Sequence, residues 1–463
     1  MGAPYRTYTN MGSTMSACNY YRQALPISMM EKMGLPIVGL LDRNDATFTA
    51  KDRMVFYLES DFSLFYQATG EQPNALMEMG KQLKPMKDDM DIMRWPPTFV
   101  VDTDDDIFNV MPLNITYGNL GTRRWDGEPL EDGNEVGLAH PNEIAPHELQ
   151  DKLNTMMEGP LTGAKLTLDD KRYVYDSDGL WHNYFSLWRD GENINISGNK
   201  QRLDNWKKTL CSANLITVST PNVESAIRRE LPDSNLPIFV TPNAIDFSMY
   251  EEIDLRDHPN EVRILWEGSA THHEGLWPLN KTLTRVAEKY PQTTWYFFGA
   301  PYKWATQNLP EDRVKMIAWC DYEAYKLRLG TIGHDINLAP LAMNTFNNSR
   351  SAIRWYENSA IWKPAATIAQ RWGAYRDEIE EGKTGLLFDT PDELETKLGG
   401  LIEDAQLRQT LASNSKDWVN THRDARKVMI RLFHKWSEVR EQQKLTMPPE
   451  EAKTKEEPVA NTI

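Results

Sequence analysis

Cysteine is scarce in this 463-residue chain. The three cysteines, Cys18, Cys211 and Cys320, lie far apart, and none belongs to a Cys-x-x-Cys pair. An odd and scattered set of this kind excludes a disulfide framework and a cysteine-based metal site. We therefore expect three small buried side chains, because free cysteine is usually buried.

Long hydrophobic runs are also lacking, and the mean hydropathy is -0.59. No stretch approaches the roughly 20 apolar residues that a membrane-spanning helix needs. The polar segment around Arg6 lacks the apolar core of a signal peptide. We expect a protein without a membrane span that stays in the cytoplasm.

Basic residues are outnumbered, because 51 Lys and Arg against 67 Asp and Glu give a formal net charge of -16. A surface of this sign does not attract nucleic acid broadly, since that needs basic side chains to neutralise phosphates. A local basic groove is still compatible with it. The length suits two α/β domains better than one core.

The most informative segment begins at Asp335 and reads DINLAPLAMNTFNNSRSAIRWYENSAIWKP. Residues 336–341 predict a buried strand, and a polar loop rich in Asn and Ser follows. Arg350, Arg354 and Glu357 then recur at offsets of four and three residues, which places them on one face of a predicted helix. Two guanidinium groups suit a diphosphate, and one carboxylate suits the vicinal hydroxyls of a ribose. This face is a candidate nucleotide-sugar site, and an ordinary helix with solvated arginines is the alternative.

The start of that helix adds a second way to bind an anion. Ser349 or Ser351 is predicted to cap it. Free backbone N–H groups at a helix start favour anions. We expect Ser351 and these N–H groups to face the phosphates.

This segment resembles a signature of retaining GT-B glycosyltransferases of the glycogen-synthase-like and sucrose-synthase-like clan (glycosyl transferases group 1). The shared residues are Arg350-Ser351, Arg354, Glu357 and the closing Lys363-Pro364. The chain departs from the familiar form at Ser349, which stands where the first of two glutamates is usual. It also has Trp362 where glycine is common.

Upstream segments agree with the resemblance in order and spacing. Residues 262–266 predict a short strand. It runs into a turn with Gly268, Ser269 and His272, where small residues let the backbone approach a phosphate. A predicted helix and a second strand, which ends at Gly299, complete a βαβ unit typical of nucleotide-binding domains.

The resemblance implies the GT-B fold, an α/β architecture of two Rossmann-like domains that face a central cleft. We expect an acceptor-side domain over residues 1–245 and a donor-binding domain over 246–415. A C-terminal helix over 416–446 is expected to cross back onto the N-terminal domain. The Pro-rich, charged tail 447–463 is predicted to be disordered.

In the N-terminal domain, the loop at Gly12 and the helix after it resemble the cleft-facing loop of this clan. The resemblance places Gly12 beside the ligand, and Arg22 would then reach a phosphate or an acceptor. A solvated arginine on a helix surface is the alternative.

A cluster of carboxylates, Asp102, Asp104, Asp105 and Asp106, ends a predicted buried strand. Clustered carboxylates hold a divalent metal in GT-A glycosyltransferases, and an aspartate in this place is the nucleophile of some phosphatases. Because a GT-A enzyme would not need the arginine-bearing helix, we expect no metal here. We predict that Asp104 or Asp105 orients the acceptor hydroxyl, with a role in capping the strand end as the alternative.

Residues 114–199 are long for a connection and rich in Gly, Asp, Asn and aromatic residues. Long segments of this kind are usually functional. Tryptophan is more often part of a core, but flat rings also suit sugars and bases. We expect acceptor binding by the aromatic residues Trp125, Trp181, Tyr184, Phe185 and Trp188.

The resemblance predicts an enzyme that moves a hexose or pentose, with retention, from a nucleoside diphosphate sugar to a hydroxyl. No cofactor is expected beyond this donor substrate. Arg350 and Arg354 would stabilise the charge that grows on the leaving phosphate. The acceptor is either a glycan precursor or a hydroxylated DNA base. Two alternatives stay open: a metal-dependent GT-A-like transferase or phosphatase built on residues 102–106, and a GT-B protein that binds without catalysis.

Overall fold

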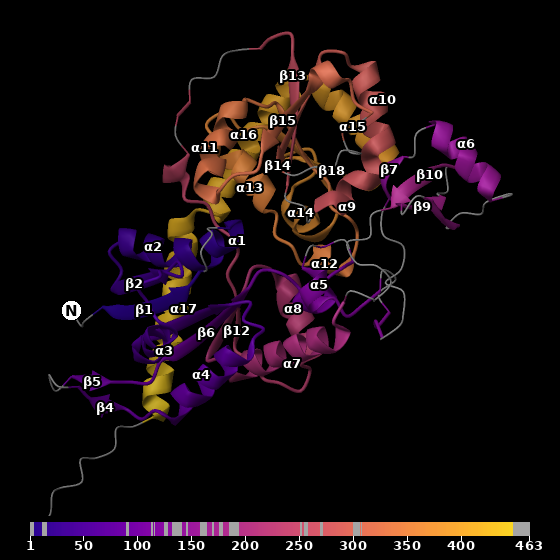
Figure 1. The fold of residues 1–463 in the computed structure, drawn as a ribbon. Coiled ribbons are helices and arrows are strands. Elements are labelled where there is room, and N and C mark those ends of the chain that lie inside the picture. The colour runs from indigo at the N-terminus through magenta and orange to yellow at the C-terminus, as the bar shows by residue number, and fades with distance from the viewer. Residues whose placement is uncertain are drawn as a thin grey trace, which may run out of the picture.

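The computed structural model describes residues 4–11, 16–88, 92–112, 114, 116–124, 128–131, 141–144, 147–157, 164–168, 171–175, 179–184, 194–250, 252–253, 258–268, 272–299, 306 and 308–447. This part of the chain forms two α/β domains, each built on a six-stranded sheet (Figure 1). The predicted fold class is therefore confirmed.

The N-terminal sheet has the strand order β12-β11-β6-β3-β1-β2, and all its pairs are parallel. Its strands are β1 (Tyr5–Asn10), β2 (Ile37–Asp42), β3 (Phe62–Tyr66), β6 (Thr98–Thr103), β11 (Leu215–Val218) and β12 (Ile238–Val240). Its helices are α1 (Ala17–Asn19), a π-helical turn (Tyr20–Ala24), α2 (Leu25–Lys32), α3 (Ala50–Glu59), α4 (Glu71–Gln82), α5 (Tyr117–Leu120), α7 (Ile196–Ser212) and α8 (Pro221–Glu230).

The C-terminal sheet is also parallel, with the order β15-β14-β13-β16-β17-β18. Its strands are β13 (Val262–Gly268), β14 (Thr293–Gly299), β15 (Val314–Ala318), β16 (Ile336–Ala339), β17 (Ala366–Gln370) and β18 (Leu386–Phe388). Its helices are α9 (His273–Leu276), α10 (Asn280–Lys289), α11 (Tyr322–Ile332), α12 (Thr345–Asn348), α13 (Ile353–Ala360), α14 (Gly373–Glu378) and α15 (Pro391–Glu403).

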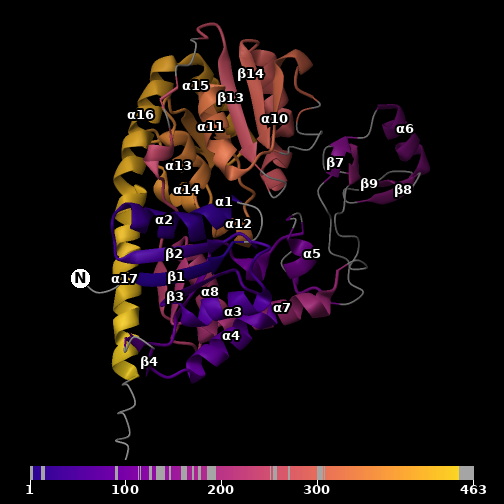
Figure 2. The ribbon, with the colours of Figure 1, turned by 60° about the vertical axis from the view of Figure 1, so that its left-hand side comes forward.

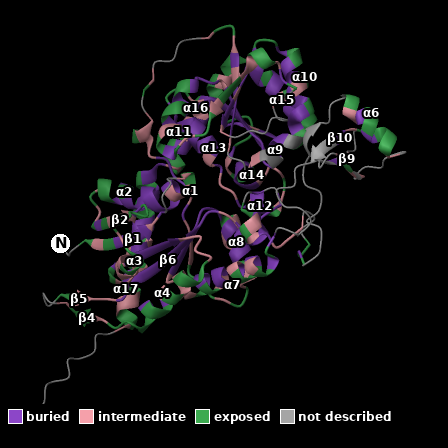
Figure 3. Ribbon diagram, viewed as in Figure 1, coloured by how far each residue is buried: buried purple, intermediate pink, exposed green. Residues whose placement is uncertain are grey.

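The centres of both sheets are apolar and covered. Every residue of β6 and of β16 is buried, as expected of parallel strands with helices on both faces. Figure 3 shows buried residues along the strands and exposed residues on the outer faces of the helices. β16 ends at Ala339, two residues before the predicted strand end, because Pro340 has no N–H for the ladder.

Two long helices close the chain, where the sequence predicts one over 416–446. α16 (Ala405–His422) belongs to the C-terminal domain, and α17 (Ala425–Thr446) follows after a break in which Asp424 caps α17. α17 contacts α2 and β6 of the N-terminal domain. Figure 2 shows both helices, in yellow, running along one side of the two domains.

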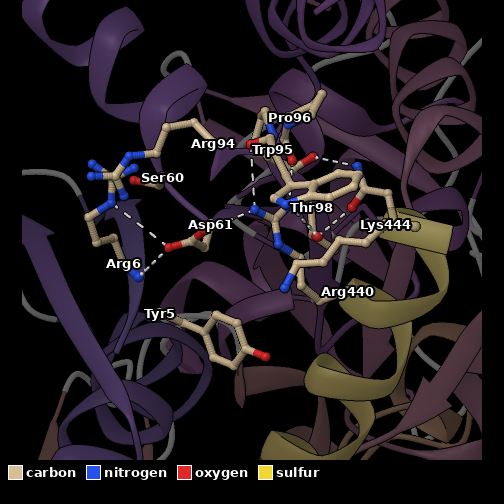
Figure 4. Close-up of polar contacts among 12 residues, drawn as sticks. Tyr5, Arg6, Ser60, Asp61, Arg94, Trp95, Pro96, Thr98, Arg440 and Lys444 are labelled. Carbon is tan, nitrogen blue, oxygen red and sulfur yellow. Dashed lines mark hydrogen bonds and ion pairs between the residues drawn. The ribbon is translucent and has the colours of Figure 1, made fainter. Parts of the chain in front are cut away.

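Arg440 fixes α17 to the N-terminal domain (Figure 4). Its side chain is fully buried, and its guanidinium donates to the Pro96 carbonyl and pairs with Asp61 at 2.8 Å. One turn earlier, the Trp436 ring lies 5.3 Å from that of Phe62 on β3. The helix is therefore an integral part of the N-terminal core.

The long insertion contains an antiparallel sheet with the order β7-β10-β9-β8. Its elements are β7 (Pro141–Ile144), α6 (His147–Met156), β8 (Lys165–Leu168), β9 (Lys171–Tyr175) and β10 (Trp181–Tyr184). Trp181, predicted to bind an acceptor, is instead buried against Leu153 and Tyr173. Its indole N–H donates to Asn154 at 2.9 Å, so this ring is part of a core. Trp125, Phe185, Trp188 and the side chain of Tyr184 lie outside the described residues.

Two further findings concern the absences in the sequence. The cysteines are free, but Cys211 is exposed and the other two are partly buried, so the expectation of three buried thiols is wrong. In the described part of the chain, no helix combines the length and the hydropathy that a membrane crossing requires.

A short hairpin, β4 (Met86–Lys87) and β5 (Met93–Arg94), completes the described elements.

Candidate active site

A cavity of about 500 Å³ lies between the two domains, where the carboxyl ends of strands from both sheets meet. Ligands of open α/β sheets bind at this edge. The residues after β6 line it from the N-terminal domain, and the ends of β13 and β14 line it from the other side. α13 contributes both Arg354 and Glu357 to its wall.

Glycines form the floor of the cavity beside β13 and β14. Gly299 has a φ of +119°, and a Cβ atom there would lie 2.2 Å from the Gly268 carbonyl oxygen. A Cβ atom on Gly268 would lie 3.0 Å from an Arg354 terminal nitrogen. Gly299 therefore needs glycine, and a side chain at Gly268 would crowd Arg354. Ser269, predicted to act with Gly268, lies outside the described residues.

Arg354 is the least satisfied charged group of the cavity. Its side chain is only 6% exposed. Within the described residues, neither terminal nitrogen has a hydrogen-bond partner, and its guanidinium carbon lies 5.9 Å from the Trp266 ring. A buried guanidinium without acceptors is unfavourable. An anionic ligand in the cavity would satisfy it.

Arg350 lies in the turn before α13, and the predicted helix start is wrong. Asn344 caps α12 inside the supposed loop by accepting from the Asn347 N–H at 2.8 Å. α13 begins only at Ile353 and has no side-chain cap. Arg350 still lines the cavity, with Nη1 at 2.9 Å from His272 Nδ1 and Nε at 3.6 Å from Asp105.

The two serines near Arg350 have separate roles. Ser351 lines the cavity and accepts a hydrogen bond from Asn243 of the N-terminal domain at 2.9 Å. Ser349 is buried, and its hydroxyl accepts from the Asp106 N–H at 3.1 Å. The residue that replaces the usual first glutamate therefore joins the two domains.

Glu357 is 4% exposed and accepts hydrogen bonds from tyrosine hydroxyls of both domains. Oε1 accepts from Tyr21 at 2.8 Å and lies 3.1 Å from the Tyr322 hydroxyl. Oε2 lies 3.2 Å from the Tyr325 hydroxyl. Burial, and then repulsion by Glu267, raises the pKa of Glu357 from its usual 4.5 to about 8. The carboxyl therefore keeps its proton to a much higher pH than an exposed glutamate does.

Glu267 at the end of β13 was not expected from the sequence. It is buried and accepts from Tyr325 and from Asn358 Nδ2 at 2.6 Å. Burial raises its pKa, while these bonds and the nearby charge of Arg354 oppose the rise. Tyr322 and Tyr325 lie about one helical turn apart, so both hydroxyls point to the same side of the helix. This spacing was the one sequence signal for a polar cluster around Glu267.

On the opposite wall, Asp104 and Asp105 follow β6. Asp104 accepts from Gln67 at 3.1 Å and from the Tyr66 hydroxyl. Burial and the neighbouring Asp104 raise the pKa of Asp105 to about 7, against the opposing charge of Arg350. Among the described residues, no three His, Cys, Asp or Glu side chains converge as metal ligands would.

The other carboxylates of the cluster have structural partners. Asp102 forms a two-pronged ion pair with Arg22, at 2.8 and 2.7 Å, and both side chains are buried. Arg22 also donates to the Thr241 carbonyl, so it connects β6 to the chain beyond β12. The expectation that Arg22 reaches the cavity is wrong. Asp106 caps the turn that follows by accepting from the Phe108 N–H. Gly12 lies outside the described residues.

Two aromatic side chains, one of them exposed, line one side of the cavity. Trp319 follows β15, is 56% exposed and lines the cavity with Phe298. Sequence reasoning missed both, because nothing in the local pattern separates a cavity-lining ring from a core ring.

No family model and no curated protein matches the chain. Among solved structures, the chain resembles sucrose-phosphate synthase from Thermosynechococcus elongatus, with 10% identity over 95% of this chain and 99% of the other and a TM-score of 0.53. A glycosyltransferase from Rickettsia africae ESF-5 shares 9% identity over 94% of this chain and 98% of its own, with a TM-score of 0.54.

A third similar structure is HepE from Anabaena in complex with UDP and glucose. It shares 11% identity over 94% of this chain and 100% of its own, with a TM-score of 0.51. Likeness at these identities concerns the fold, and it extends over both domains of the chain.

Proposed function

We propose that this chain, which has the two-domain fold of the GT-B glycosyltransferases, transfers a sugar from a nucleoside diphosphate sugar to an acceptor hydroxyl. The observation that carries the proposal is Arg354, a buried guanidinium whose two terminal nitrogens have no acceptor among the described residues, beside the backbone of Gly268. A diphosphate supplies the acceptor oxygens that such a group needs. HepE, of the same fold, is in complex with UDP and glucose, which makes UDP the first nucleotide to test.

The donor is proposed to lie across the carboxyl edge of the C-terminal sheet. Arg354 and Arg350 would hold the diphosphate, and Glu357 would accept from the ribose hydroxyls. The bond between the anomeric carbon and the diphosphate oxygen breaks as the acceptor oxygen bonds to that carbon. Negative charge then grows on the diphosphate, where the two guanidinium groups stabilise it without rearrangement.

The acceptor is proposed to enter from the side of the N-terminal domain. Asp105, or Asp104 next to it, would accept a hydrogen bond from the acceptor hydroxyl and orient it. We propose transfer with retention, in which the hydroxyl proton passes to the leaving diphosphate. A glycan precursor and a hydroxylated DNA base both offer such a hydroxyl, and the sugar is a hexose or a pentose.

Binding without transfer is a second candidate function, and Ser349 favours it. This residue replaces a glutamate that is usual in the clan, and its hydroxyl faces Asp106 rather than the cavity. Slow hydrolysis of the donor without acceptor distinguishes an enzyme from a binding protein. Complete absence of released nucleoside diphosphate, from a protein that binds the donor, would favour the second candidate.

The proposal is tested by thermal unfolding with UDP, ADP, GDP, CDP and dTDP and the corresponding sugars. A ligand at about 100 times its dissociation constant stabilises the fold by roughly 2.7 kcal/mol. We expect one family of nucleotides to raise Tm in the wild type and not in Arg354→Ala. Arg376→Ala, an exposed arginine paired with Asp377, is the control that should behave as the wild type. No shift with any nucleotide would contradict the proposal.

A further inference from the structure

Tyr21 reaches the donor side of the cavity from the other domain. It belongs to the π-helical turn Tyr20–Ala24, in which every residue is buried. Its hydroxyl donates to Glu357 Oε1 at 2.8 Å, across a sequence separation of 336 residues. Short π-helical turns often occur at functional sites. The carboxylate assigned to the ribose is thus held by a residue that the donor domain does not contain.

The number of hydroxyl hydrogens around Glu357 shows that its carboxylate keeps unused lone pairs. The Tyr322 hydroxyl reaches both the Tyr21 oxygen and Glu357 Oε1, but it has one hydrogen to give. If the Tyr322 hydroxyl donates to the Tyr21 oxygen and the Tyr21 hydroxyl donates to Glu357, one lone pair stays free on Oε1. Tyr325 likewise divides one hydrogen between Glu267 and Oε2. Each oxygen of Glu357 therefore keeps one lone pair that could accept from a hydroxyl of a vicinal diol.

Most titratable groups around Glu357 are tyrosines, and its charged neighbours include Arg354, one turn earlier on α13 in the same cavity wall. The titratable groups that face it are Glu267 from β13, Tyr20 and Tyr21 from the π-helical turn, Tyr250 before the C-terminal sheet, Tyr322, Tyr325 and Lys326 from α11, and Tyr375 from α14. Lys326 is buried, and its ammonium lies 4.2 Å from the centre of the Tyr20 ring. Burial lowers its pKa to about 8. Hydrogen bonds from the tyrosine hydroxyls are therefore the interactions that oppose the raised pKa of Glu357.

We propose that Tyr21 is a positioning residue that makes recognition of a nucleoside diphosphate by Glu357 depend on the contact between the two domains. The proposal rests on the proposed function, because it assigns the ribose to Glu357. Tyr21 orients the carboxylate and supports its ionised form, which accepts from both hydroxyls of the diol. An isolated donor domain would lack this bond.

The consequence for protonation has a definite sign. Burial and Glu267 raise the pKa of Glu357, and the bond from Tyr21 opposes the rise. Without that hydroxyl the carboxyl stays protonated to a higher pH. A protonated carboxyl cannot accept equally at both oxygens, so diol recognition should be weaker near neutral pH and recover in base.

The first measurement is nucleotide affinity between pH 7 and pH 9 by calorimetry, with UDP, ADP and GDP as probes. We expect wild-type affinity to rise through a midpoint near pH 8 and the midpoint to move upward in Tyr21→Phe. Tyr20→Phe is the matched control, since its hydroxyl contacts the Met249 sulfur and not Glu357. Glu357→Gln should remove the step, which separates this titration from that of Lys326.

The second measurement compares each nucleotide with its 2′-deoxy counterpart at pH 7.5. Loss of a hydrogen bond to a charged group usually costs on the order of tenfold in affinity or more. Tyr21→Phe should therefore weaken binding of the ribonucleotide about tenfold and that of the deoxynucleotide by no more than about twofold. A loss caused only by loosened packing would affect both nucleotides equally.

The outcomes separate the two proposals. If no nucleoside diphosphate binds the wild type, the proposed function fails and the role of Tyr21 fails with it. If the wild type binds, but Tyr21→Phe matches Tyr20→Phe in both midpoint and deoxynucleotide ratio, only the role of Tyr21 is overturned. Circular dichroism of both variants confirms that they are folded.

Discussion

At the scale of single residues, two buried arginines show how partners decide between structure and binding. Arg22 has its donors taken by Asp102 and by the Thr241 carbonyl. Neither terminal nitrogen of Arg354 has an acceptor within the described residues. A buried charge that is already paired stabilises an arrangement, whereas an unpaired one is available to a ligand. The local sequence does not distinguish these two arginines.

This difference predicts unequal effects on stability. Arg22→Met leaves Asp102 as a buried unpaired carboxylate, and we expect it to lower the free energy of unfolding by about 3–5 kcal/mol. Arg354→Met removes a guanidinium whose terminal nitrogens have no acceptor, but also the charge that opposes the raised pKa of Glu267, so we expect a smaller loss of stability than in Arg22→Met. Urea denaturation of both variants is the measurement. Equal destabilisation would mean that Arg354 has a partner in solution.

Kinetics test the same arginines as catalytic residues. Arg350→Ala and Arg354→Ala should lower kcat more than they raise KM for the donor, because the charge that they meet grows only as the bond to phosphate breaks. Loss of one such contact typically costs on the order of a hundredfold in rate. Steady-state assays with correctly folded variants decide this. Values of kcat near the wild type in both would remove these arginines from the donor site.

Two carboxyl groups predict how stability depends on pH. The pKa of Glu357 is raised to about 8 and that of Asp105 to about 7. The folded protein therefore binds these protons more tightly than the unfolded chain does, so their contribution is complete below the ordinary values of 3.8 and 4.5 and is lost as the pH rises through 7 to 8.

We expect Tm of the unliganded protein to fall from pH 4.5 to about pH 8 and to level off above it, and to fall less in the double variant Asp105→Asn with Glu357→Gln. Calorimetric scans across this range measure both. An equal fall in the double variant would assign the pH dependence to other groups.

At the scale of elements, α17 shows how a helix that is distant in sequence completes a domain. Trp436 and Arg440 lie one turn apart and enter the N-terminal domain at β3 and at the segment before β6. α17 is therefore part of the N-terminal core, although the C-terminal sheet precedes it in the chain.

Trp436→Ala tests this role. Removing a buried tryptophan usually costs about 3–5 kcal/mol, and we expect that loss in urea denaturation. Gln442→Ala, at an exposed position of the same helix, should change stability little. A small effect of Trp436→Ala would show that α17 can leave the domain without unfolding it.

At the scale of the whole molecule, the cavity exists only because the two domains meet. Neither domain alone brings Asp105 to 3.6 Å from Arg350, or Tyr21 to 2.8 Å from Glu357. The groups proposed to bind the donor and the acceptor thus come from different domains, which are joined by contacts such as that of Ser351 with Asn243.

This arrangement predicts turnover without a divalent metal. Arginines can neutralise the diphosphate in place of a cation, and the carboxylates at and after the end of β6 already have protein partners. Exhaustive chelation should leave the rate unchanged, with a manganese-dependent glycosyltransferase as the positive control. Strict recovery of activity on adding manganese would favour residues 102–106 as a metal site.

The sequence by itself determined the α/β class, the two domains and the face that carries Arg354 and Glu357. These follow from local periodicity and from spacing within one segment, which the backbone geometry of a helix converts directly into position. It also indicated the bare turn at Gly268, because glycine is needed wherever backbones approach closely.

Only the tertiary structure decided which charged groups are available. Arg22 and Arg354 differ in partners that come from distant strands and helices, and the local sequence contains no record of those partners. The same holds for Tyr21 and Glu267, whose importance arises from burial beside Glu357 and not from any motif. Long-range packing sets the dielectric surroundings and the hydrogen-bond partners of a side chain, and these fix its charge and its chemistry.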